Sequence, residues 1–340
     1  MIAIVVVLLG CEAHTATRSS TATHSSTATR TTANPDRPIE VVATVGMVAD
    51  IVREVGGTRV AVSQLMGPGV DPHLYRGSRD DVRSILAADM VFYSGLMLEG
   101  KLTGMLEKVA RKKPVVAITK SLSRDSVLEE EGTAGHSDPH VWMDVLAWSS
   151  CVDVVADSLA EFDPANEFQF RSAALAYQET LAKLDKYGRQ VMSTVPASGR
   201  VLITSHDAFH YFGRAYGLEV FGVQGLSTDS EAGLKQINSL VDTIVQRKIK
   251  AVFVESSVPK KSILAVVDGA GSRGHNVIIG GELFSDAMGP GATYEGTYVG
   301  MLDHNLTIVA RSLGGGAPER GMQEALMLSA NRTESEQREP

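Results

Sequence analysis

One segment in the middle of the chain constrains the possible fold more than any other. Residues 164–196 read PANEFQFRSAALAYQETLAKLDKYGRQVMSTVP, with a proline at each end and Gly188 as the sole internal helix breaker. Apolar side chains recur at spacings of three and four residues, as they do on the buried face of a helix. The pattern predicts one helix of roughly 30 residues, about 45 Å long at 1.5 Å per residue. A helix of this length divides the chain into two halves and joins them stiffly.

On both sides of this segment, short β-branched runs alternate with helical patterns. Before it, IEVVATV at residues 39–45 and MVFYSG at residues 90–95 are typical of strands, and MVADIVREVGG is typical of a helix. After it, the pattern restarts with RVLITS and continues with LEVFGV, KAVFVESS and HNVIIGG. A strand-helix-strand order implies parallel strands whose sheet is covered by helices on both faces. The sequence therefore predicts an α/β protein made of two lobes.

The N-terminus has the pattern of an export signal. Residues 1–10, MIAIVVVLLG, are apolar throughout, but a membrane-spanning helix needs about 20 such residues. The tetrapeptide LLGC, which ends at Cys11, resembles the bacterial lipoprotein box, in which the cysteine is lipidated after cleavage. The alternative is an ordinary secretory signal with an incidental cysteine. Either way, we expect the protein in the periplasm or at the outer face of the cytoplasmic membrane.

Three imperfect hexads, TATRSS, TATHSS and TATRTT, follow this signal. Such small polar residues bury too little surface to order the chain, so they predict a flexible tether. The chain has two cysteines, Cys11 and Cys151, and lipidation of the first leaves the second without a partner for a disulfide. Cys151 lies in a helical pattern and is interpreted as a small buried apolar residue.

The composition narrows the class of partner. With 340 residues, 44% of them hydrophobic, the chain can bury a large core. Its net charge of −8 and the lack of a basic stripe argue against nucleic acid as a partner. An acidic surface attracts cations instead.

The tripeptide Asp-Pro-His occurs twice, ending at His73 and at His140, in a chain with nine histidines. Proline fixes its own φ and holds the preceding aspartate extended, so both histidines leave their loops in a defined direction. His206 directly follows RVLITS, and Asp286 follows NVIIGGELFS. All four residues lie beyond the carboxyl ends of predicted strands, where open α/β sheets bind ligands. Three imidazoles and one carboxylate suit Zn²⁺, Mn²⁺ or Fe²⁺ better than Ca²⁺ or Mg²⁺.

Two other histidines compete for a place in this site. His210 stands four residues after His206, and on a helix both would share a face. Placement at the strand end favours His206, and His210 is expected one turn inside a helix. His136 lies in the acidic loop EEEGTAGHSDPH and offers an outer site at most.

Five motifs in order, GPGVDPHLY, DPHVWMDV, SHDAFHYF, VQGLSTDSEAG and GGELFSDAMG, resemble the TroA-like, cluster A-I metal-binding solute-binding proteins of bacterial ABC transporters. The resemblance covers about residues 40–312. It implies two α/β lobes with parallel-type four-stranded sheets joined by one long rigid backbone helix. It also implies a receptor that binds Zn²⁺ or Mn²⁺ through His73, His140, His206 and Asp286 and delivers the ion to a membrane permease. We further expect a monomer that is not an enzyme, because four protein ligands leave little room for a substrate. Some manganese-selective relatives carry glutamate at the position of His206, so the physiological metal stays open.

Two other functions compete with that of a transport receptor. A tethered lipoprotein could serve as a surface adhesin, and a metallohydrolase would also hold zinc. However, adjacent Ser205, His206 and Asp207 cannot form a catalytic triad, and no catalytic residue is predicted. The predicted organisation is a signal segment, a tether, an N-terminal lobe, a linking helix, a C-terminal lobe and a disordered tail, at residues 1–11, 12–38, 39–163, 164–196, 197–313 and 314–340.

Overall fold

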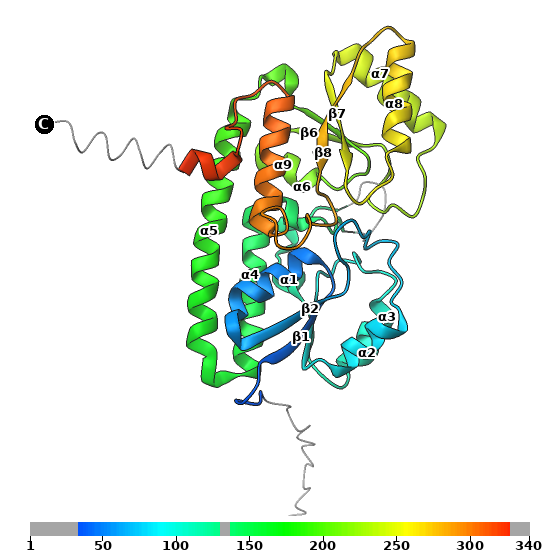
Figure 1. Cartoon of the computed structure of the whole chain (residues 1–340). Coiled ribbons are helices and arrows are strands. Elements are labelled where there is room, and N and C mark those ends of the chain that lie inside the picture. Colours follow the sequence, from blue (N-terminus) through cyan, green and yellow to red (C-terminus); the bar gives the residue numbers. More distant parts are fainter. Residues whose placement is uncertain (1–32, 130–136, 327–340) are drawn as a thin grey trace, which may run out of the picture. The chain divides into compact units, whose positions relative to one another are not determined.

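The first half of the chain, residues 39–163, contains a four-stranded parallel sheet. The computed structural model describes residues 33–129 and 137–326 (Figure 1). The strands pair in the order β2-β1-β3-β4, and every pair is parallel. They are β1 (Ile39–Ala43), β2 (Val60–Gln64), β3 (Met90–Tyr93) and β4 (Val115–Ala117), and the helices between them are α1 (Gly46–Gly56), α2 (Arg79–Ala87) and α3 (Thr103–Ala110). The valine-rich runs predicted as strands thus form one sheet with parallel pairing.

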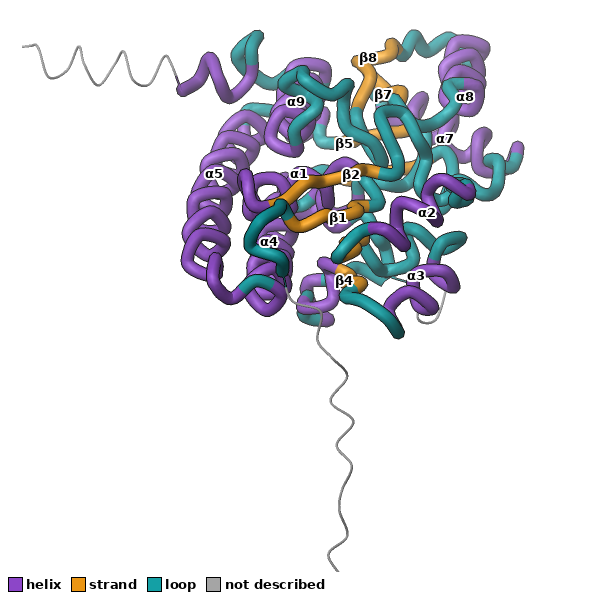
Figure 2. The backbone as a smooth tube through the Cα atoms, turned by 60° about the horizontal axis from the view of Figure 1, so that its bottom comes forward, coloured by secondary structure: helices purple, strands orange, loops and turns teal. Residues whose placement is uncertain are grey.

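Two long helices, α4 (Val145–Phe162) and α5 (Glu167–Ser193), pack against each other along one flank of this sheet (Figures 1 and 2). The 27 residues of α5 extend about 40 Å at 1.5 Å per residue, which confirms the prediction of one long helix. The helix begins at Glu167 because Pro164–Asn166 form a short 3₁₀ turn. Cys151 is buried on α4, as expected for a small apolar residue.

The second half, residues 197–313, contains two pairs of parallel strands. Strands β5 (Val201–Thr204) and β6 (Glu219–Gly222) form one pair, and β7 (Ala251–Glu255) and β8 (Ile278–Leu283) form the other. The expected four-stranded sheet is therefore hydrogen-bonded as two two-stranded sheets in the described chain. β5 still lies beside β7. Ile203 on β5 and Val252 on β7 belong to the same buried apolar cluster. The helices of this half are α6 (His210–Tyr216), α7 (Leu234–Arg247), α8 (Lys261–Ser272) and α9 (Tyr298–Ser312).

The largest apolar core extends through both halves. It includes Val48 on α1, Leu184 on α5 and Leu306 on α9, each with no exposed surface. A second cluster lies among β5, β7, α7 and α8 and contains Ile244 and Val266. Both α1 of the first half and α9 of the second half pack on α5. Burial of apolar surface against this helix therefore holds the two halves together.

Part of the segment predicted as a disordered tail is folded. Residues 321–326 form a helical turn, and Met322 is 6% exposed within the main core. The carboxylate of Asp303 on α9 accepts a 2.8 Å hydrogen bond from the backbone N–H of Met322. The buried Met322 side chain and the hydrogen bond to Asp303 thus extend the folded chain beyond residue 314. Residues 327–340, like residues 1–32 with the predicted signal and most of the tether, lie outside the described part.

Asp50 on α1 lies where the first half meets α5 and α9. Its carboxylate accepts a 2.6 Å hydrogen bond from the hydroxyl of Tyr177 on α5, and it also accepts a hydrogen bond from the backbone N–H of Tyr298, the first residue of α9. Asp50 is 6% exposed. Burial raises its pKa from 3.8 to about 6 in spite of these two hydrogen bonds.

The Asp50→Asn variant should be more stable than the parent protein near neutral pH, by an amount that shrinks as pH falls toward about 4. The Asp50 carboxyl has a pKa of about 6 in the folded protein, whereas its pKa in the unfolded chain is near 3.8. Ionisation of the buried carboxyl therefore destabilises the folded state as pH rises through this window. About two pKa units correspond to about 3 kcal/mol. Urea unfolding of both proteins in a chelator, at about pH 4 and about pH 7.5, measures the difference. An equal difference at both pH values would contradict the assignment.

Candidate metal centre

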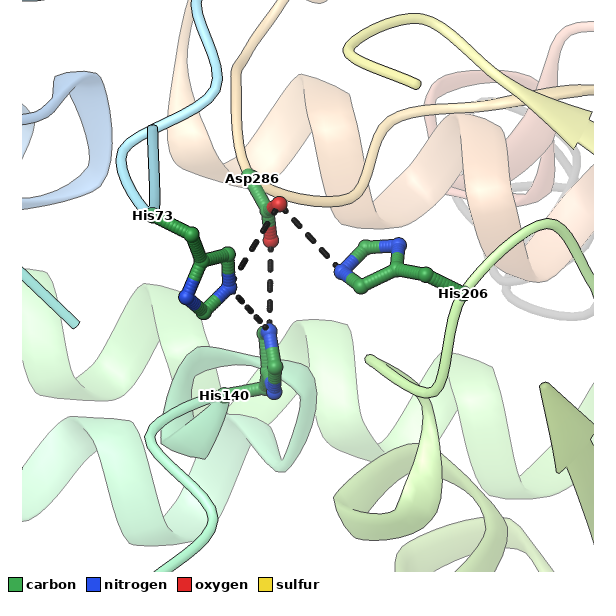
Figure 3. A group of neighbouring side chains, drawn as sticks. All are labelled: His73, His140, His206 and Asp286. Atoms are coloured by element: carbon green, nitrogen blue, oxygen red, sulfur yellow. Dashed lines mark hydrogen bonds and ion pairs between the residues drawn. The ribbon is translucent and has the colours of Figure 1, made fainter. Parts of the chain in front are cut away.

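Four loops bring His73, His140, His206 and Asp286 together (Figure 3). His73 lies in the loop after β2, and His140 lies in the connection between β4 and α4. His206 comes two residues after β5, and Asp286 comes three residues after β8. One potential ligand atom from each residue lies within 4.8 Å of the others. The residues predicted from separate strand ends thus form one cluster.

The imidazole Nε2 atoms and the carboxylate of Asp286 point toward a common centre (Figure 3). The distance from Asp286 Oδ2 is 3.2 Å to Nε2 of His206 and 3.8 Å to Nε2 of His73. Asp286 Oδ1 is 3.4 Å from Nε2 of His140, and the Nε2 atoms of His73 and His140 are 3.3 Å apart. Two donors come from each half of the chain.

The cluster is buried and leaves polar atoms without hydrogen bonds. His140 and His206 have no exposed surface, Asp286 is 1% exposed and His73 is 8% exposed. Nε2 of His206 and both carboxylate oxygens of Asp286 have no hydrogen-bond partner in the described residues. Buried polar atoms are almost always satisfied. A cation bound among these atoms would satisfy all of them, so the residues present fit a metal ion.

Two buried carboxylates, Asp138 and Glu255, bond the Nδ1 atoms of His140 and His206, on the side of each ring away from the centre. Asp138 Oδ1 accepts hydrogen bonds from the backbone N–H of His140, at 2.9 Å, and from its Nδ1, at 2.7 Å. Glu255, at the end of β7, does the same for His206, with 2.8 Å to the backbone N–H and 2.5 Å to Nδ1. A proton fixed on Nδ1 leaves the lone pair of Nε2 facing the centre, as metal binding requires.

The two Asp-Pro-His motifs differ in one respect. Asp71 Oδ1 accepts the backbone N–H of His73 at 2.8 Å, as Asp138 does for His140. The other oxygen of Asp71 accepts a hydrogen bond from the hydroxyl of Thr228 in the second half instead of bonding an imidazole. Both aspartates therefore fix the loop, but Asp138 alone of the two also orients the ring that follows it.

Burial and the neighbouring charges act in opposite directions on the pKa values of these four residues. Burial lowers the pKa of His73 to about 4. Burial acts in the same direction on His140, but the carboxylates of Asp138 and Asp286 outweigh it and raise the pKa to about 9. Neighbouring carboxylates also outweigh burial at His206 and raise its pKa. Although burial alone would raise the pKa of Asp286, the adjacent imidazoles keep it well below its usual value. Carboxylates that favour a proton here also favour a divalent ion, whose binding releases such protons.

Sequence reasoning missed Glu255. Its signal was a single acid at the end of the apolar run KAVFVESS, but nothing in the sequence places β7 beside β5. His210 is the first residue of α6 and not one turn inside it, because the chain loops through Phe209 before the helix begins. Its side chain is 40% exposed and faces Asp207, with Nε2 3.1 Å from Oδ1. It does not join the cluster, and His136 lies outside the described residues.

An α/β fold with a buried group of three histidines and one aspartate is compatible with a receptor protein that binds a metal ion. The family model of the periplasmic component A of zinc-uptake complexes, ZnuA, matches residues 41–312. The chain belongs to this family of metal-binding receptors of ABC transporters, which are binding proteins and not enzymes.

Individual relatives are similar over most of their length. The chain is 45% identical to the manganese-binding lipoprotein MntA of Bacillus subtilis (strain 168), over 82% of this chain and 90% of the relative. It is 48% identical to the zinc-binding protein TroA of Treponema pallidum (strain Nichols), over 79% and 87% of the two chains. The solved structure of the periplasmic zinc-binding protein TroA from Treponema pallidum superposes with a TM-score of 0.79 at 46% identity, covering 81% of this chain and 99% of that one.

These relatives carry zinc or manganese in their names, in keeping with a centre built from nitrogen and oxygen donors. Across residues 33–129 and 137–326, every helix is too short or too polar to span a membrane.

Proposed function

We propose that this protein captures Zn²⁺ or Mn²⁺ outside the cytoplasmic membrane and delivers it to the permease of an ABC transporter. His73, His140, His206 and Asp286 serve as the ligands. The observation that carries this proposal is the buried cluster of four donors, in which three oriented Nε2 or carboxylate oxygen atoms have no hydrogen-bond partner among the described residues. A catalytic zinc usually has three protein ligands and an open position for water, whereas four protein ligands suit capture.

The donor set accepts more than one metal. Imidazole nitrogen suits zinc and iron, while the carboxylate also suits manganese. Affinity for such a site generally rises from Mn²⁺ through Fe²⁺ to Cu²⁺, and Zn²⁺ follows Cu²⁺ in this order. The protein therefore binds Zn²⁺ more tightly than Mn²⁺, and the supply of each ion outside the cell decides which one it carries.

The proposed location follows from the N-terminal sequence. Cleavage before Cys11 and its lipidation would anchor the chain to the membrane, and residues 12–38 would act as a tether. The receptor then diffuses within reach of its permease. Residues 39–163 and 197–313 act as two lobes, linked by the helix in 164–196, and the metal lies between them.

Binding of the metal should raise the thermal stability of the protein. A ligand that binds only the folded state at 1,000 times its dissociation constant adds about 4 kcal/mol to the free energy of unfolding. Scanning calorimetry of chelator-treated protein, with Zn²⁺ or Mn²⁺ added back, measures this effect. Mg²⁺ is the control, because it demands oxygen ligands and should leave the melting temperature nearly unchanged.

An unchanged melting temperature with both Zn²⁺ and Mn²⁺ would contradict the proposed function. Elemental analysis of protein purified without chelator then identifies the ion that the cell loads. A metal-dependent hydrolytic activity that disappears in His206→Ala would instead favour a metallohydrolase.

A further inference from the structure

One ligand of the proposed metal centre faces a cavity that reaches the surface. His73 is 8% exposed, while the other three ligands are at most 1% exposed. A cavity of about 300 Å³ is lined by His73, by Ser137 and Pro139, and by two loops, residues 96–101 of the first half and residues 226–229 of the second half. Among the described residues, His73 is the one ligand that lines this cavity. An ion that reaches the centre through it meets Nε2 of His73 before the buried donors.

Two contacts join the two halves of the chain beside this cavity. Lys101 Nζ lies 2.6 Å from Asp229 Oδ1, and these side chains are 29% and 52% exposed. Behind this ion pair, the hydroxyl of Thr228 donates a hydrogen bond to Asp71, two residues before His73. Both contacts connect one half of the chain with the other, and residues 228 and 229 supply both partners from the second half.

Neither of the two loops that line the cavity forms a helix or a strand. The loop that carries Lys101 is fixed by Glu99, a 2% exposed carboxylate that accepts 2.6 Å and 2.8 Å hydrogen bonds from the Thr44 hydroxyl and the Ser94 backbone N–H. The opposite loop runs from β6 to α7 without regular structure. Both walls of the cavity are therefore irregular loops that side-chain hydrogen bonds hold in place.

We propose that this cavity is the path by which the metal ion reaches and leaves His73, and that the Lys101–Asp229 ion pair is the bridge that closes it. The inference rests on the proposed function and specifies how that same centre exchanges its ion. A divalent cation entering the cavity is attracted by Asp229 and repelled by Lys101. The pair must separate before a hydrated ion passes, so its strength sets the rates of binding and release while the four ligands set the affinity.

Two variants distinguish the effect of breaking the Lys101–Asp229 ion pair from the effect of the charge that remains in the cavity. Lys101→Met breaks the bridge and removes the repulsion, so binding and release should both accelerate, by about two- to fivefold for a partly exposed ion pair. Asp229→Asn breaks the same bridge but leaves the Lys101 charge uncompensated, so release should accelerate while binding slows. Raising the salt concentration should slow binding more steeply in Lys101→Met than in the parent protein, and less steeply in Asp229→Asn.

The chain carries its own reporter for these rates. Trp142 is one of two tryptophans, its ring lies 5.3 Å from that of His140, and its Nε1 donates a 2.9 Å hydrogen bond to the carbonyl of Ser285. Stopped-flow fluorescence after mixing with Zn²⁺, and after mixing the loaded protein with a chelator, gives the binding and release rates. Lys260→Met is the matched control, because Lys260 forms a 2.7 Å ion pair with Glu282 away from the residues that line the cavity.

The bridge is supported if Lys101→Met changes both rates with little change in the dissociation constant, Asp229→Asn changes them in opposite directions, and Lys260→Met changes neither. The inference is overturned if Lys101→Met keeps the parent rates, or if Lys260→Met matches it, since the effect would then come from net charge. A parent protein that binds neither Zn²⁺ nor Mn²⁺ at equilibrium would overturn the proposed function itself. Parent binding with unchanged variant rates overturns the bridge alone.

Discussion

Replacing His140 with alanine should weaken Zn²⁺ binding by more than about 100-fold, because loss of a ligand costs more than loss of a ligand's hydrogen-bond partner, which costs 10–100-fold. The Nε2 atom of His140 is 3.4 Å from Asp286 and 3.3 Å from His73, and the side chain is fully buried. Without it, the first half contributes His73 alone. Competition titration against a chelator of known affinity measures the dissociation constant.

His210→Ala is the matched control for this variant. Its side chain is 40% exposed, and the carboxylate oxygens that it faces belong to Asp207, at 3.1 Å, and to Asp138, at 3.8 Å, neither of which is in the cluster of four ligands. We expect its dissociation constant to stay within about tenfold of the parent value, below the range for loss of an orienting partner. Equal losses in His140→Ala and His210→Ala would show that His210 contributes to metal binding as much as His140 does. Far-UV circular dichroism of each variant checks that it is folded.

Glu255→Gln should weaken Zn²⁺ binding by about 10–100-fold although Glu255 does not belong to the ligand cluster. One carboxylate accepts both the backbone N–H and the Nδ1 proton of His206. A glutamine offers one oxygen for these two donors and turns an amide NH₂ toward the other. It also removes a buried negative charge that favours a cation at His206, so both the orientation and the basicity of this ligand decline.

The control for the lost charge is Glu219→Gln. Glu219 begins β6 in the same half and pairs with Arg247 at the surface, with both side chains more than 40% exposed. Its loss should leave the affinity nearly unchanged, since exposed ion pairs contribute little. A dissociation constant of Glu255→Gln within about twofold of the parent value would show that His206 keeps its orientation without this carboxylate.

Most of the fold and half of the proposed centre could be read from local sequence. The periodicity of residues 164–196 gave α5, and β-branched runs gave the strands, because both patterns depend on neighbours along the chain. The repeated Asp-Pro-His indicated His73 and His140 for the same reason. His206 and Asp286 followed from the rule that ligands gather beyond the carboxyl ends of parallel strands.

Features that depend on distant pairing were not predictable. The bond from Glu255 to His206 joins β7 to β5, and the contact of Lys101 with Asp229 joins loops 128 residues apart. The separation of the second half into two strand pairs is also a tertiary outcome, since each strand alone has the same apolar pattern. The ordered turn at Met322 rests on one buried residue and one acceptor, too short a pattern to be recognised in a charged segment.

The apolar core that extends through both halves bears on how the free energy of metal binding is used. A receptor that closes by a large rotation uses part of its binding free energy to drive the closure, so its ion is held less tightly than the donors alone would allow. Here α1, α5 and α9 share buried contacts, and wide rotation would expose apolar surface. The four donors lie within 4.8 Å of one another above this shared core, and a site that forms without wide rotation keeps most of its coordination energy as affinity. Under the proposed function, we expect unloading of the ion to need work from outside the receptor, applied to the loops around the centre.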